Sequence, residues 1–119
     1  MEEKLREIAN SIPEVKSLSI VDEEGFILYK FDKPGLDVDP EEISVHIVNP
    51  VKTLLESIED ISGEEDSLEE MVLFTEKHVL LVYKLVNDTY LVAFAERDHL
   101  YGKIRFKLRA KLNEIKLSL

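Results

Sequence analysis

Three short apolar runs in the second half of the chain constrain the fold more than any other feature. They are Met71–Phe74, Val79–Tyr83 and Tyr90–Ala95, and none of them alternates between apolar and polar residues. A β-strand that is apolar on both sides requires both faces of its sheet to be covered. Asn87-Asp88 separates the last two runs and is typical of a turn. The sequence therefore predicts strands that lie between two layers of helices.

A β-hairpin is predicted near the N-terminus, with strands over residues 16–22 and 26–31. The connection is Asp22-Glu23-Glu24-Gly25. A glycine at the end of a short loop can adopt the left-handed backbone conformation that closes it. Five strands are thus expected in all.

Three helices are predicted around these strands. The first covers residues 2–11 and ends before Pro13. The second begins at Asp39-Pro40-Glu41-Glu42, where Asp39 suits the N-cap, Pro40 the first helical position and Glu42 the reciprocal capping site. Pro50 is expected to kink this helix near residue 46. The last helix is expected from about Asp98, as its N-cap, to Leu117, with Leu100 among its core-facing residues.

These elements define the expected fold class. It is an α/β (α+β) three-layer sandwich with a five-stranded antiparallel sheet and the order α-β-β-α-β-β-β-α. Two helices are expected on one face of the sheet and one on the other. The chain contains no internal repeat and no long linker, so residues 1–119 are predicted to form a single domain.

Few residues indicate catalysis or the binding of a metal or cofactor. The chain has no cysteine, and His46, His78 and His99 lack the spacing of metal ligands. The serines and glycines form no nucleophile elbow and no phosphate-binding loop, and the acidic runs at residues 22–24 and 64–66 lack the spacing of a calcium loop. The expectation is a non-enzymatic protein without a cofactor or metal, and an enzyme is the least favoured class.

The charge distribution bears on the partners. The net charge is −10, which disfavours nucleic acid as the main partner. Residues 1–98 hold 9 basic and 24 acidic residues, whereas residues 99–119 hold 6 basic and 1 acidic. The basic end indicates either a solvated helix face, an anionic partner or complementary docking within an assembly. No transmembrane segment and no secretory signal are predicted, which favours a cytoplasmic protein.

A dimer interface is predicted where the second helix meets the first of the three apolar runs. Met71–Phe74 is expected at a sheet edge, where it carries neither a proline nor an inward charge. The second helix has an apolar stripe that is wider than one packing surface needs. The alternative is that this helix buries its whole stripe on its own sheet. The predicted interface residues are Ile47, Val48, Val51, Leu54, Leu55, Met71, Leu73 and Phe74.

Three segments, in this order, resemble the roadblock/dynein light-chain family. Residues 20–28 (IVDEEGFIL) resemble its first hairpin, residues 71–85 its central hairpin, and residues 100–105 (LYGKIR) the start of its last helix. The family's glycines near residues 15–18 and 76–78 are missing, which leaves the subfamily open. The likeness covers nearly the whole chain.

The resemblance implies a homodimer, or a heterodimer with a second roadblock-like chain, that joins two sheets through the third strand. It also implies a small Ras-like GTPase as partner, which the domain regulates or scaffolds without an inserted arginine finger. Arg97 is the nearest candidate for such a finger. The alternative function is a profilin-like or PAS-like domain that senses a small ligand, which would need an internal polar pocket.

Overall fold

The structure is a computed structural model that describes all residues except 99 and 101. Its helices and strands follow the predicted order α-β-β-α-β-β-β-α, with the second helix divided into three consecutive segments. The elements are α1 (Glu2–Ser11), β1 (Val15–Asp22), β2 (Ile27–Asp32), α2 (Pro40–Glu42), η1 (Ile43–Val48), α3 (Asn49–Ser62), β3 (Glu70–Phe74), β4 (His78–Lys84), β5 (Thr89–Glu96) and α4 (Lys103–Ser118).

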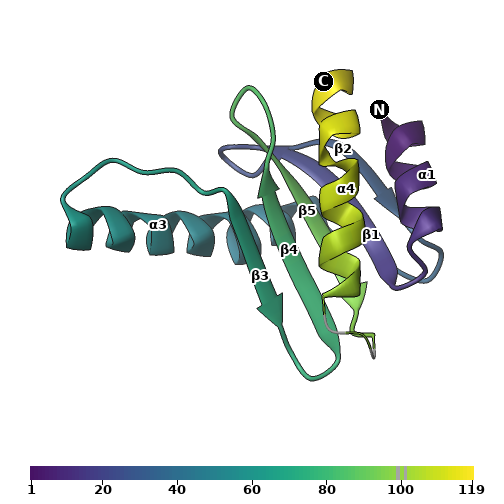
Figure 1. Cartoon of the computed structure of the whole chain (residues 1–119). Coiled ribbons are helices and arrows are strands. Elements are labelled where there is room, and N and C mark those ends of the chain that lie inside the picture. Colours follow the sequence, from purple (N-terminus) through teal and green to yellow (C-terminus); the bar gives the residue numbers. More distant parts are fainter. Residues whose placement is uncertain (99, 101) are drawn as a thin grey trace.

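The five strands form one antiparallel sheet in the order β2-β1-β5-β4-β3 (Figure 1). The two longest strands, β1 and β5, pair at its centre, and β2 and β3 are its edges. The predicted edge position of Met71–Phe74 is therefore confirmed.

Helices cover both faces of the sheet, which confirms the three-layer arrangement (Figure 1). On one face, α1 and α4 bury residues such as Leu5 and Leu108 against Leu91 and Ala93 of β5. On the other face, Ile43 of η1 packs with a smaller cluster that includes Val82 and Val92. Alternate residues of β5 thus enter two different apolar clusters, because successive side chains of a strand point to opposite faces.

The first hairpin closes as its sequence predicts. One side-chain oxygen of Asp22, Oδ1, accepts hydrogen bonds from the backbone amides of Glu24 (2.9 Å) and Phe26 (3.0 Å). Gly25 has a φ of +92°, which a residue with a side chain adopts only under strain. The turn also lies directly against the second helix, because the nearest atom to a Cβ built on Gly25 would be the Ser44 Cα, 2.7 Å away.

The second helix begins at the predicted residue. The Asp39 side chain accepts a hydrogen bond from the Glu41 amide (2.9 Å), and Pro40 occupies the first turn. Glu42, predicted as the reciprocal capping residue, instead donates its backbone N–H to the Asp39 carbonyl (3.0 Å). We expect Asp39→Ala to lower the free energy of unfolding by about 1 kcal/mol, and Asp39→Ser, which keeps a capping oxygen, to cost less. Urea denaturation of the two variants measures the difference, and equal stabilities would contradict the capping role.

The predicted interruption before Pro50 takes the form of a π-helical turn. Proline has no backbone N–H, so the hydrogen bond from residue 50 to residue 46 cannot form. In its place, the Asn49 amide donates to the Ser44 carbonyl, one residue further back than in an α-helix. The three segments therefore form one irregular helix from Pro40 to Ser62.

The prediction for the last helix was wrong at its N-terminus. Helix α4 begins at Lys103 rather than Asp98, and Gly102 occupies the N-cap position with a φ of +89°. A left-handed residue at position 102 cannot continue a right-handed helix, so Asp98 does not cap it. Leu100 is 67% exposed and is not a core residue, whereas Ile104, Leu108 and Ile115 are buried as predicted. His99 and Tyr101 lie outside the described residues.

Candidate functional site: an apolar surface on helix α3 and strand β3

Helix α3 leaves most of its apolar stripe uncovered. None of its 14 residues is buried, and Leu54, Ile58 and Ile61 are 60%, 51% and 88% exposed. Figure 1 shows the reason, because the helix crosses one face of the sheet and then extends past strand β3. The alternative prediction, that this helix buries its whole stripe on its own sheet, is therefore wrong. Only Ile43, at the start of the stripe, is fully buried.

Strand β3 provides the sheet edge next to this helix. It pairs with β4 on one side, from Glu70 opposite Tyr83 to Phe74 opposite Val79. No other described strand pairs with its second side. Unpaired edges with exposed apolar side chains are sites at which another strand can add.

The side chains of β3 divide between the two faces of the sheet. Met71 packs in the cluster beneath the α2-η1-α3 helix, and Leu73 is 52% exposed. Phe74 lies against the opposite cluster, beneath α1 and α4, with the Arg97 guanidinium 6.0 Å from its ring centre. Seven of the eight predicted interface residues thus gather around α3 and its side of β3, and Phe74 does not.

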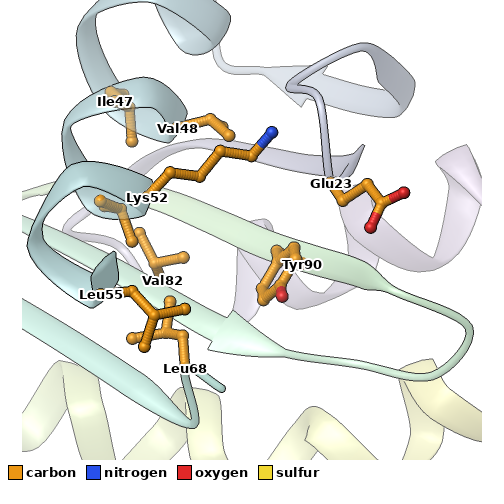
Figure 2. Close-up of a pocket in the computed structure, with 9 residues that line it drawn as sticks. Glu23, Ile47, Val48, Lys52, Leu55, Leu68, Val82 and Tyr90 are labelled. Atoms are coloured by element: carbon orange, nitrogen blue, oxygen red, sulfur yellow. The ribbon is translucent and has the colours of Figure 1, made fainter. Parts of the chain in front are cut away.

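An apolar cleft of about 200 Å³ lies between the helix and the sheet (Figure 2). We call it the first cleft, and its lining residues are Glu23, Ile47, Val48, Val51, Lys52, Leu55, Leu68, Val82 and Tyr90. Figure 2 shows the Lys52 amine extending towards the segment that carries Glu23. Burial, followed by the negative charges of Asp88 and Glu23, raises the pKa of the Tyr90 hydroxyl, so this side chain is neutral at physiological pH. Such a cleft is suited to binding an apolar side chain.

The residues that could suggest catalysis do not all meet at one site, because His78 and Arg97 line one polar pocket and His46 lines a different pocket. His46 is an exposed residue of η1, whereas His78 begins β4 and stacks on Phe94, with 5.0 Å between the ring centroids. The Arg97 side chain donates to the Thr75 carbonyl (3.2 Å) and so lies against the β3–β4 turn. Among the residues that the structure describes, no group of three or more histidine or carboxylate side chains could hold a metal ion.

The basic residues of α4 fasten this helix to the rest of the protein. Arg105 donates to Glu70 through two nitrogens, Nε (2.9 Å) and Nη2 (2.7 Å), and Arg109 lies 3.7 Å from the same carboxylate. On the other side, Lys103 pairs with Glu14 at 3.2 Å. Burial alone would raise the pKa of Glu14, but a backbone hydrogen bond, Lys103 and Lys107 hold it below its usual value. Much of the positive charge is thus used within the fold.

Among the residues that the structure describes, no helix has the length and hydropathy needed to cross a bilayer.

The first cleft is the part of the site that the sequence did not predict. Its residues come from segments as distant as Glu23 and Tyr90, and no local sequence pattern brings them together.

Comparison with known proteins gives no match to a family model and none to a curated protein. Solved structures do match over the whole fold. Myxococcus xanthus MglB has a TM-score of 0.78 at 13% identity, covering 98% of this chain and 92% of the other. A structure described as MglB with tetrameric arrangement has a TM-score of 0.76 at 15% identity, covering 97% and 84%. A Roadblock/LC7 domain from Streptomyces avermitilis has a TM-score of 0.72 at 13% identity, covering 99% and 96%.

Profilins share the same arrangement of strands and helices. A profilin from Schizosaccharomyces pombe has a TM-score of 0.65 at 12% identity, covering 96% of this chain and 94% of the other. The chain therefore has the Roadblock/LC7 fold, which confirms the resemblance at the level of the fold. A fold that also occurs in profilins does not select a function by itself.

Proposed function

We propose that this chain is a cytoplasmic, dimeric and non-catalytic interaction domain that binds a small Ras-like GTPase and regulates or scaffolds it. The observation that carries the proposal is the long helix α3, whose apolar stripe extends beyond the sheet edge without being buried. Exposed apolar surface of this kind, with polar residues around it, marks interaction sites in proteins.

The proposed dimer forms by pairing of two β3 edges. An added strand would extend the sheet beyond β3, into the region over which α3 already projects (Figure 1). Residues such as Leu54 and Ile58 would then lie over the sheet of the partner, and Leu73 would be covered as well. The partner is a second copy of this chain or a second roadblock-like chain. Such an interface between identical copies is two-fold symmetric, so each contact occurs twice.

The resemblance seen in the sequence supports the proposed GTPase partner, and the fold shared with MglB and Roadblock/LC7 structures agrees with it. The proposed effect acts through the conformation of the GTPase. Arg97 is held against the β3–β4 turn, and the proposal assigns it no role in the partner's active site.

The test uses the purified full chain and each small Ras-like GTPase encoded in the same genome. We expect one of them to bind in a pull-down, and its rate of GTP hydrolysis or nucleotide release to change by about tenfold, the usual size of coupling between sites. Stopped-flow fluorescence with a labelled nucleotide measures these rates. Arg97→Lys should behave like the wild type, and failure of every GTPase to bind would contradict the proposal.

The second candidate is a domain that senses a small apolar ligand. The first cleft is mainly apolar rather than the internal polar pocket that was expected for such a domain, so it suits an apolar ligand. Its polar groups belong to Glu23, Lys52 and Tyr90. Native mass spectrometry of the purified protein tests it directly. A bound molecule that is lost from a Val51→Trp variant, in which the cleft is filled, would support the ligand-binding function over the GTPase.

A further inference from the structure

A second cleft lies on the other side of the helix from the first. Its volume is about 330 Å³, and its lining residues are Ser17, Leu36, Asp37, Val38, Glu42, Ile43, His46, Ile47, Val92 and Phe94. The two clefts share only Ile47. The second cleft includes no residue of β3 or of the segment before it, so its lining takes no part in the proposed strand pairing.

The rim of this cleft carries negative charge over an apolar floor. Asp37 and Glu42 are exposed at its edge, where the Lys30 amine lies 3.7 Å from the Asp37 carboxylate. Val92 and Phe94 of β5 lie beneath. The cleft belongs to a strongly acidic part of the chain. Residues 34–76 contain 13 acidic residues and one lysine, a balance of −12.

An exposed aromatic side chain with the opposite charge around it lies on the other face of the sheet. Phe106 of α4 is 77% exposed, although its neighbours Ile104 and Leu108 are buried. Lys107 follows it directly, and Lys103 and Arg109 lie one helical turn away on either side. The helix therefore presents an apolar protrusion within a basic surface.

We propose that copies of this chain stack through these two surfaces, with Phe106 of one copy in the second cleft of the next. A cavity of about 150 Å³ already accommodates benzene, so a cleft of this size has room for the phenylalanine ring. Lys107 then faces Glu42, and these opposite charges orient the contact and speed its formation.

This contact joins two unlike surfaces, which distinguishes it from the proposed β3 dimer. Unlike surfaces produce a head-to-tail assembly that continues until it closes or grows into a filament. The contact depends on exposed charges, which salt screens, because the Debye length falls from about 10 Å at 0.1 M salt to about 3 Å at 1 M. A dimer built on the apolar surface of α3 and β3 has no such dependence.

Light scattering of the full chain at about 0.05 M and 0.5 M NaCl, over a range of protein concentrations, tests the stacking. We expect species larger than the dimer at low salt that dissociate at high salt. Phe106→Ala should raise the concentration needed for assembly by about tenfold or more, since it removes the aromatic side chain that the proposed contact would bury. Leu117→Ala is the matched control, because Leu117 is 88% exposed on the same helix and lies outside the contact.

A charge exchange tests the pairing of the two surfaces. Lys107→Glu and Glu42→Lys should each weaken the assembly, and the double variant should restore it. A mass that does not change with salt would overturn the stacking, as would a Phe106→Ala variant that assembles like the wild type. Failure of the double variant to recover would overturn the proposed charge pairing. None of these results tests the proposed β3 dimer. The molecular mass measured at high salt tests that dimer separately.

Discussion

A glutamate in place of Leu54 or Leu73 is expected to convert the proposed dimer into a folded monomer. Both side chains are more than half exposed in the single chain, Leu54 on α3 and Leu73 on β3. The folded chain can therefore accept a charge at either position. In the proposed dimer the same position becomes buried, where an unpaired carboxylate is costly.

The expected loss of affinity is large because the interface is symmetric. Burial of a leucine side chain contributes about 1.5–3 kcal/mol, and a two-fold interface contains each residue twice. A loss of about 4 kcal/mol corresponds to about a thousandfold weaker association. Light scattering measures the change in mass, and circular dichroism shows whether the variant is folded.

Leu117→Glu is the matched control for this experiment. Leu117 is more exposed than either leucine of the interface and lies on α4, on the opposite face of the sheet. The control should keep the mass of the wild type at high salt. Phe74→Glu is less informative, because Phe74 packs against the core beneath α1 and α4 and a charge there also destabilises the fold. A Leu54→Glu variant that is still dimeric would contradict the proposed interface.

Gly25→Ala is expected to destabilise the fold by about 2–5 kcal/mol, the largest effect of any single methyl group that we predict. Two costs combine at this residue. A left-handed backbone costs a residue with a side chain about 1–2 kcal/mol, and an extra methyl group in a packed region costs a further 1–3 kcal/mol. The second cost arises because the new Cβ would lie 2.7 Å from the Ser44 Cα, a backbone atom that cannot rotate away.

Gly35→Ala separates these two costs. Gly35 has nearly the same φ, +91°, but no atom lies within 4 Å of the Cβ position. This variant should lose only about 1–2 kcal/mol. Urea denaturation with a fluorescence or circular dichroism signal compares the two variants with the wild type. Equal losses at the two glycines would show that the contact between the hairpin turn and the second helix can relax.

The local elements of this fold could be predicted from neighbouring residues. The Asp22–Gly25 turn and the Asp39 N-cap form because the required groups lie within four residues of one another. The apolar runs of β4 and β5 predicted two covered faces, since a strand shows the environment of both its sides in its own sequence. The interruption before Pro50 follows in the same way from one missing N–H.

The start of α4 shows the limit of this approach. Asp98 is of a residue type that is favoured at the N-cap, but Gly102 adopts a left-handed conformation and the helix begins after it. The choice between two possible starting points depends on which residues can reach the core. Ile104 and Leu108 reach it, whereas Leu100 does not.

Local patterns thus determined the strands, the turns, the helix faces and the order of elements. The tertiary structure alone decided how much of the apolar stripe of the second helix is covered. A period of three to four residues places Leu54, Ile58 and Ile61 on one side of a helix, but it contains no information about how far the sheet extends beneath them. That extent depends on the strand order β2-β1-β5-β4-β3, which places β3 at the edge and lets α3 project beyond it. The same long-range pairing forms both clefts from residues that are distant in sequence, and for this reason neither cleft could be predicted.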